Sequence, residues 1–133
     1  ATFNGGAVGF VITGDSGVLL SNGQSTVTAN FVNGSVDVDL TDFTGVSQVS
    51  GNLVDAPFDS LRLSGADLAG SGFSGGALTA TGESTVAGVI GDGATIQAEG
   101  QFYGVEGDAP TEVGGLIFAT GESGQIFTSF IAD

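Results

Sequence analysis

Polar and apolar side chains alternate along most of this chain. The clearest alternation runs through residues 26–31 (TVTANF) and resumes in residues 35–41 (SVDVDLT). A period of two places the apolar residues of each run on one face of a β-strand and the polar residues on the other. Asn33-Gly34 separates the two runs, and this dipeptide between alternating segments favours a β-hairpin with both turn residues at positive φ. The sequence therefore predicts a half-buried hairpin here.

Similar strands are expected along the rest of the chain. Alternation returns at residues 61–64 and 94–103, and glycine-rich turns recur between them. This spacing predicts about eight or nine short strands, each near the usual length of about 5–6 residues. Residues 44–60 lack clear alternation, so we expect a loop there, and residues 58–69 have room for one short helical turn. No segment has a long 3.6-residue apolar period, so little or no helix is expected.

These strands predict one all-β domain spanning residues 1–133. A small antiparallel sheet with one apolar face closes most simply into a barrel, because closure removes the edge strands. About eight strands give a barrel of lipocalin-like size, whose interior is either filled by side chains or holds one small ligand. The 10 phenylalanines could fill it. A transmembrane barrel is the rival interpretation, but outward positions are mostly polar and the chain has no Trp and one Tyr, so a soluble barrel is favoured.

The first strand and the last two strands are apolar on both faces. If the small residues of the first strand (Ala7, Gly9) face inward, its larger apolar residues must face outward. For the last strand we expect Phe127, Ser129 and Ile131 to face inward. Clustered outward apolar residues typically mark a contact with a partner. The predicted partner-binding residues are Val8, Phe10, Ile12, Ile117, Ile126 and Phe130.

Composition excludes several classes of function. The formal net charge is −14, Lys and Arg together number one, and there is no Cys or His. Without Cys, His or Lys the chain has no thiol nucleophile, no usual general base near neutral pH and no Schiff-base amine. So acidic a chain is also unsuited to nucleic acids. We therefore expect no enzyme activity and no cofactor, and no apolar run is long enough for a membrane-spanning helix. The one cation, Arg62, is expected to pair with a neighbouring carboxylate.

Two weak ligand candidates remain. Asp37, Asp39 and Asp42 lie close together and could hold Ca²⁺ through oxygen ligands, but their spacing matches no EF-hand loop. A solvated acidic face is the favoured interpretation, so no metal site is predicted. Tyr103 is the only side chain that could ligate haem iron strongly, and a role as an aromatic residue at the barrel rim is favoured over it.

Residues 100–104 (GQFYG), followed by residues 109–118 (APTEVGGLIF), resemble the barrel signature of transferrin-binding-protein-B-like surface proteins. Residues 65–75 and the hairpin at 27–38 are similar to other strands of that family. The resemblance implies an eight-stranded, lipocalin-like barrel on the surface of a Gram-negative bacterium or secreted from it. Family members bind host proteins such as transferrin, or bind haem. The chain differs from the family in lacking lysine, a second handle domain and the cysteine that carries a lipid anchor.

The sequence thus predicts a non-enzymatic surface or secreted binding module that recognises a protein or a haem- or iron-related ligand. Two alternatives stay open. One is a structural subunit that assembles with itself into an extracellular assembly, and the other is a carrier of small hydrophobic ligands.

Overall fold

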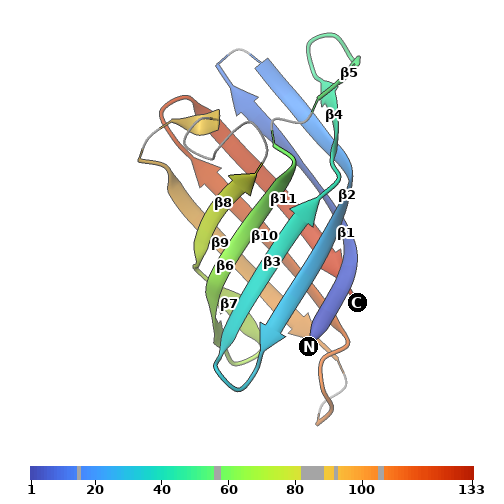
Figure 1. The fold of residues 1–133 in the computed structure, drawn as a ribbon, viewed down its shortest axis with the longest axis vertical. Coiled ribbons are helices and arrows are strands. Elements are labelled where there is room, and N and C mark those ends of the chain that lie inside the picture. The colour runs from blue at the N-terminus through green and yellow to red at the C-terminus, as the bar shows by residue number, and fades with distance from the viewer. Residues whose placement is uncertain (15, 56–57, 82–88, 92, 105–106) are drawn as a thin grey trace.

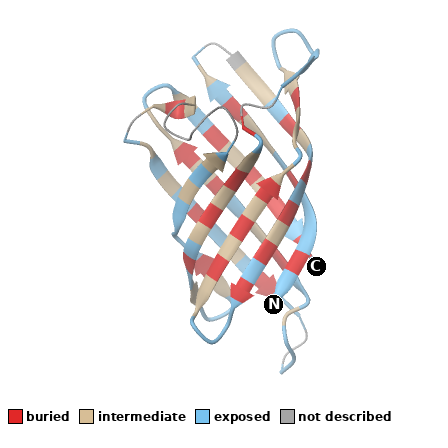
Figure 2. Ribbon diagram, in the orientation of Figure 1, coloured by how far each residue is buried: buried red, intermediate tan, exposed pale blue. Residues whose placement is uncertain are grey.

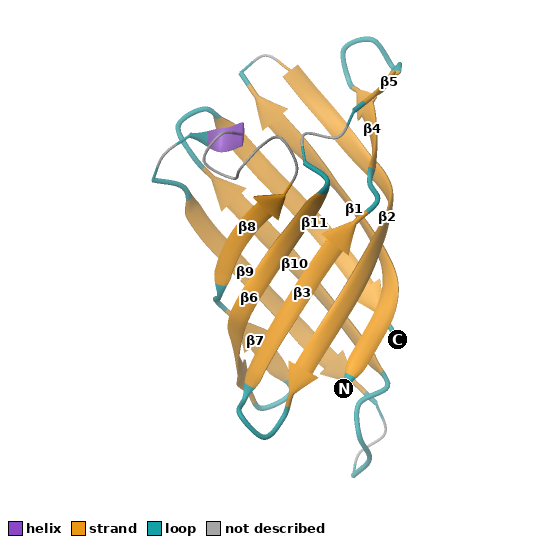
Figure 3. Ribbon diagram, in the orientation of Figure 1, coloured by secondary structure: helices purple, strands orange, loops and turns teal. Residues whose placement is uncertain are grey.

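The computed structural model of the chain describes residues 1–14, 16–55, 58–81, 89–91, 93–104 and 107–133. Strands make up most of these residues, with a helical turn at residues 89–90 (Figure 3). No helix in the described part is long and apolar enough to cross a membrane. The strands are β1 (Thr2–Thr13), β2 (Ser16–Asn30), β3 (Ser35–Thr41), β4 (Thr44–Ser47), β5 (Leu53–Val54), β6 (Ser60–Ala69), β7 (Gly72–Ser74), β8 (Ala77–Thr81), β9 (Thr95–Tyr103), β10 (Glu112–Thr120) and β11 (Gly124–Ala132).

Eight of the strands form a closed antiparallel ring in the order β1-β11-β10-β9-β7-β6-β3-β2 (Figure 1). The ring closes because β1 pairs with β11 along one edge and with β2 along the other. Three further strands, β4, β5 and β8, lie outside this ring. The predicted all-β barrel of about eight strands is therefore confirmed.

Two local predictions were wrong. Within residues 44–60, β4 and β5 pair with each other, and β4 adds to the edge of β2 from Val18 to Ser21. The proposed helical turn within residues 58–69 is instead strand β6. Leu61 and Leu63 on β6 are fully buried, and the polar residues that alternate with them face outward, as a strand with one face on the core requires.

The predicted β2–β3 hairpin forms, but with a longer turn than Asn33-Gly34 implies. Asn30 pairs with Ser35, so residues 31–34 form the turn. Of the two expected positive-φ residues only Gly34 has one, at 73°. The Asn30 side chain accepts hydrogen bonds from the backbone N–H groups of Val32 and Asn33 at 3.1 and 3.0 Å, which stabilises the turn.

Side chains fill the barrel. Buried and exposed positions alternate along its strands, so that buried bands cross the sheet (Figure 2). Near one end the Phe102 ring packs against Phe3, Phe31 and Phe73, with ring centroids 5.4–5.7 Å apart. The buried hydroxyl of Thr128 donates a hydrogen bond to the Ile117 carbonyl oxygen at 3.2 Å. The interior is thus a packed core.

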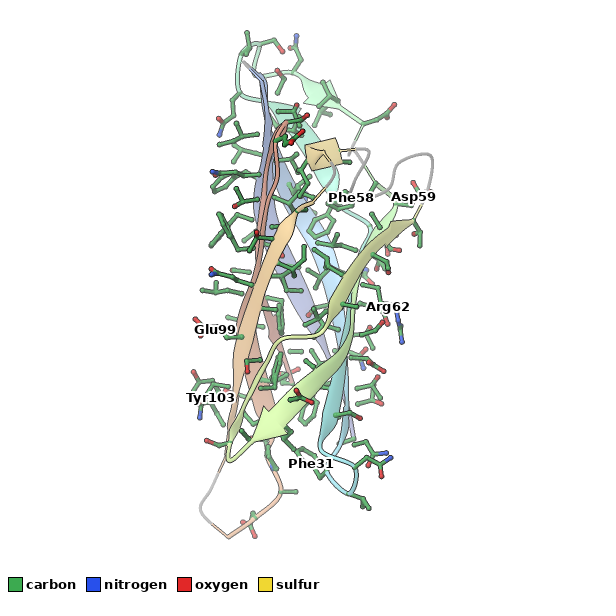
Figure 4. All side chains as sticks on the ribbon, turned by 90° about the vertical axis from the view of Figure 1, so that its left-hand side faces the viewer. Phe31, Phe58, Asp59, Arg62, Glu99 and Tyr103 are labelled. Atoms are coloured by element: carbon green, nitrogen blue, oxygen red, sulfur yellow. The ribbon has the colours of Figure 1, made fainter. Side chains whose placement is uncertain are left out.

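The wall divides between β8 and β9. β7 and β8 both pair with β6 in one continuous register, from Ala69↔Gly72 to Ser60↔Thr81. β7 also pairs with β9, but within the described residues β8 pairs only with β6. The separation follows Gly75 and Gly76, whose φ angles are 78° and 99°. Figure 4 shows β8 and β9 as separate ribbons. Positive φ at both positions redirects the chain, and glycine adopts it without strain.

Candidate interaction surface

A row of large apolar side chains crosses the outside of four adjoining strands. The cross-strand register joins Leu19 of β2 to Phe10 of β1, Phe10 to Phe127 of β11, and Phe127 to Phe118 of β10. The rings of Phe10 and Phe127 stack with centroids 5.4 Å apart, and Phe118 meets Phe127 edge-on at 6.3 Å. All three rings are half-buried and partly cover one another.

More apolar side chains adjoin this row, and Ile131 lies one outward position beyond Ser129 on β11. Val8, Ile12 and Leu116 are 54%, 38% and 41% exposed, and Ile131 is 70% exposed. We call these eight residues together the outer apolar face: Val8, Phe10, Ile12, Leu19, Leu116, Phe118, Phe127 and Ile131. Contiguous apolar patches of this kind are uncommon on proteins that act alone, and they typically mark contact sites.

The structure places half of the predicted contact residues on this face. Val8, Phe10 and Ile12 point outward as expected, because Ala7 and Val11 face the core. The predicted outward orientation of Ile117, Ile126 and Phe130 was wrong. These three side chains are buried in the core, with exposures of 0%, 0% and 2%.

Space inside the barrel decides the orientation of β11. The strand is apolar on both faces, so its hydrophobic pattern fits either register. Phe130 lies opposite Ala7 of β1 and Gly115 of β10, and a Cβ on Gly115 would come within 2.7 Å of the Phe130 ring. Small residues on both neighbouring strands thus make room for an inward Phe130. Ile126 then also faces inward, because residues four apart on a strand lie on the same face.

Sequence reasoning missed five residues of the outer apolar face. Phe127 and Ile131 were placed inward together with the wrong register of β11. Leu19, Leu116 and Phe118 were not singled out, because their strands lack clean alternation. A usable signal was present in Phe118 and Phe127, which flank the turn at residues 121–123 at positions that a hairpin brings opposite each other.

The opposite side of the barrel is polar and carries the one basic side chain (Figure 4). The Arg62 guanidinium on β6 contacts the Asp39 carboxylate on β3 at 2.6 Å and the Asp37 carboxylate at 3.5 Å. Asp37 also accepts a hydrogen bond from the Gly65 backbone N–H at 2.8 Å. The expected pairing of Arg62 is therefore confirmed, and it occupies two of the three carboxylates weighed as calcium ligands.

The remaining ligand candidates lie apart from each other. Asp42 follows β3 as an exposed residue with φ of 60°. Tyr103 is 55% exposed at the end of β9, where its register partner is Glu112. Within the described part of the chain, no group of three or more His, Cys, Asp or Glu residues is arranged to hold a metal ion.

Ile131 stands alone between two glycines. Its register partners are Gly6 on β1 and Gly114 on β10, and a groove lies on each side of its side chain. Neither glycine has positive φ. A Cβ on Gly6 would meet nothing closer than 3.7 Å, and one on Gly114 nothing closer than 3.5 Å. Neither the backbone conformation nor core packing therefore explains the absence of a side chain at these two positions.

Fold and surface together define a closed, filled β-barrel with one apolar outer side and one polar outer side. No protein-family model matches this sequence, and no curated protein matches it either. The resemblance to transferrin-binding-protein-B-like barrels therefore stays a prediction based on the sequence motif.

Proposed function

We propose that this protein is a non-enzymatic binding module that recognises a partner protein through the outer apolar face. The observation that carries the proposal is the Leu19–Phe10–Phe127–Phe118 row, four large apolar side chains aligned across four strands on the outside of the barrel. Leaving them in water is unfavourable, and covering them would release about 25 cal/mol for each Å² of apolar surface removed from water.

Two further features support binding over the alternatives. The packed core gives little support to a carrier of small hydrophobic ligands, because phenylalanine and aliphatic side chains occupy the space that such a ligand would need. The lack of His, Cys and Lys leaves the chain without the usual nucleophiles and bases of catalysis. We place the module on the cell surface of a Gram-negative bacterium or in its surroundings, on the strength of the family resemblance alone.

Affinity capture from the surface and secreted fractions of the native cells tests this proposal. We expect the native chain to retain a partner that the Val8→Glu variant loses, because the substitution puts a charge into the outer apolar face, where Val8 is 54% exposed. Val32→Glu makes the same chemical change on the β2–β3 turn, where Val32 is 96% exposed, and it should retain the partner. If all three proteins retain the same partner proteins, the outer apolar face is not the binding surface.

Self-assembly is a second candidate, favoured by one observation. Ile131 projects between two grooves, so an identical face could receive it in a two-fold arrangement. Light scattering on the native chain at rising concentration separates this candidate from the first. A monomeric mass throughout excludes it, whereas a dimer that Phe10→Ser/Phe127→Ser dissociates without loss of β-structure supports it.

A further inference from the structure

The surface over Gly114 has the geometry of a socket. Outward positions on β9, β10 and β11 form a grid of three strands by three rows, and Gly114 is its centre. Neighbouring positions across the strands lie about 5 Å apart, and those along a strand about 7 Å apart. Because the centre has no side chain, the surrounding residues enclose a groove floored by backbone.

The sides of this socket differ in chemistry. Ile131 and Leu116 form an apolar wall on two adjacent sides. Gln101 lies across from Ile131 and donates a hydrogen bond to the Ser71 hydroxyl at 2.6 Å, which directs its amide toward β7 and away from Gly114. The groove is thus open at its centre and apolar along part of its edge.

Carboxylates stand at both ends of the socket. Glu99 pairs with Leu116 at one end, and Glu112 pairs with Tyr103 at the other. Both glutamates are exposed, and neither forms a salt bridge within the described part of the chain. Figure 4 shows Glu99 and Tyr103 pointing outward, on the opposite side of the barrel from Arg62. An apolar groove between two carboxylates and a phenol suits a side chain with an apolar stem and a cationic head.

We infer that the Gly114 socket binds the cationic side chain of an arginine or lysine of a basic partner protein. The inference rests on the proposed function and names the chemistry of its partner. Charge favours such a partner over a second copy of this chain, which has a net charge of −14 and one Arg or Lys residue, Arg62. Asp37 and Asp39 already hold that arginine. A second copy of these residues thus offers no unengaged Arg or Lys side chain.

The probe for this inference is the peptide acetyl-Val-Arg-Val-amide, titrated into the ¹⁵N-labelled chain and followed by NMR. We expect saturable shifts of the backbone amides of Gly114, Gly115 and Leu116. The same peptide with citrulline, which has the shape of arginine without its charge, should bind about tenfold more weakly, because it forms no ion pair with either glutamate. Rising NaCl should weaken binding of the arginine peptide.

Matched variants distinguish binding at the socket from general electrostatic attraction of the peptide to an acidic protein. Gly114→Leu fills the socket and should abolish binding, whereas Gly6→Leu fills the groove on the other side of Ile131 and should leave the dissociation constant within about twofold. Glu99→Gln/Glu112→Gln should raise the dissociation constant about tenfold, while Asp55→Asn/Asp67→Asn removes the same charge elsewhere and should change it by less than about twofold. Amide dispersion in each spectrum reports whether the variant is folded.

Three outcomes would overturn the inference: no saturable shift, shifts centred on other acidic residues, or unchanged binding by Gly114→Leu. The proposed function fails by a different result, the retention of all partners by Val8→Glu in the capture experiment, because Val8 belongs to the outer apolar face but does not line the socket. If the peptide binds the socket but Val8→Glu loses no partner, the socket stands and the wider face does not. If Val8→Glu loses its partner but the peptide does not bind the socket, the face stands and the choice of a cationic side chain is wrong.

Discussion

Phe73 on β7 lies directly over Gly100, its cross-strand partner on β9. A Cβ on Gly100 would overlap the Cζ and Cε1 atoms of the Phe73 ring. The same ring packs 5.7 Å from Phe102 and 6.4 Å from Phe130. β7 has only three residues, and this aromatic–glycine pair is the central one of its three register pairs with β9. Glycine is needed here because the ring takes the space of a side chain.

Gly100→Ala should therefore destabilise the barrel by about 1–3 kcal/mol, because overpacking forces the ring or the strand to shift. Combining it with Phe73→Leu should cost less than the sum of the two single changes, because the smaller side chain makes room for the new methyl. Urea denaturation of both single variants and the double variant measures this coupling. Additive losses would contradict the contact.

The register of β11 predicts opposite consequences for two phenylalanines. Phe130→Ala removes a buried ring and should lower the free energy of unfolding by about 3–5 kcal/mol. Phe127→Ala removes a half-buried ring from the outer apolar face and should cost about 1 kcal/mol. Thermal and urea unfolding of the two variants check the order, and a larger loss for Phe127→Ala would show that the strand faces the other way.

Removing Arg62 from the polar side of the barrel should lower the free energy of unfolding by a modest, salt-dependent amount. Arg62→Met leaves the carboxylates of Asp37 and Asp39 without their cation. The Arg62 side chain is 43% exposed, so we expect a loss of about 0.5–1 kcal/mol in low salt. The loss should shrink in 0.5 M NaCl, where the Debye length falls to about 4–5 Å. Arg62→Lys keeps the charge and should lose less; an equal loss for the two variants would mean that the guanidinium geometry, and not the charge alone, holds the two carboxylates.

Salt should stabilise the chain as a whole. A net charge of −14 makes the compact state repel itself, and screening weakens that repulsion. The melting temperature at neutral pH should rise by about 5 °C between 0.01 and 0.5 M NaCl, which corresponds to about 1 kcal/mol for a domain of this size. Melting curves followed by circular dichroism measure this. A melting temperature that does not change with NaCl would indicate that the repulsion is already offset locally.

The division between β8 and β9 should be visible in hydrogen exchange. Amides of β8 that point away from β6 have no strand partner within the described residues. They should exchange about tenfold or more faster than amides of β10, which pairs with a strand on each side. Equal protection in both strands would mean that β8 is paired along its second edge in solution.

The closed barrel was predictable because its physical causes are local. Alternation in residues 26–31 and 35–41 defines two strands, Gly34 supplies the positive-φ turn residue, and antiparallel strands with one apolar face favour closure. The short strands were harder to predict from the sequence. β5 has two residues and β7 three, too few for a period of two to be recognised.

Only half of the predicted contact face was correct, for a reason visible in β11. Ile126 and Phe127 are adjacent, as are Phe130 and Ile131, so a shift by one residue exchanges one apolar set for another. A hydrophobic pattern cannot choose between such registers. The choice depends on the space left by Gly115 across the strand pair, which only the three-dimensional pairing shows.

Closure of the ring by β1 and β11 also has a kinetic consequence. The Ser25 hydroxyl donates to the carbonyl oxygen of Ile131, 106 residues away, and Asn4 exchanges backbone hydrogen bonds with Asp133. Such distant contacts form late, so folding should be slow compared with that of a helical bundle of equal length. During synthesis, a nascent chain that lacks β11 exposes the edges of β1 and β10 together with unburied phenylalanines. These are the features that holdase chaperones bind, and they last until the final strand docks.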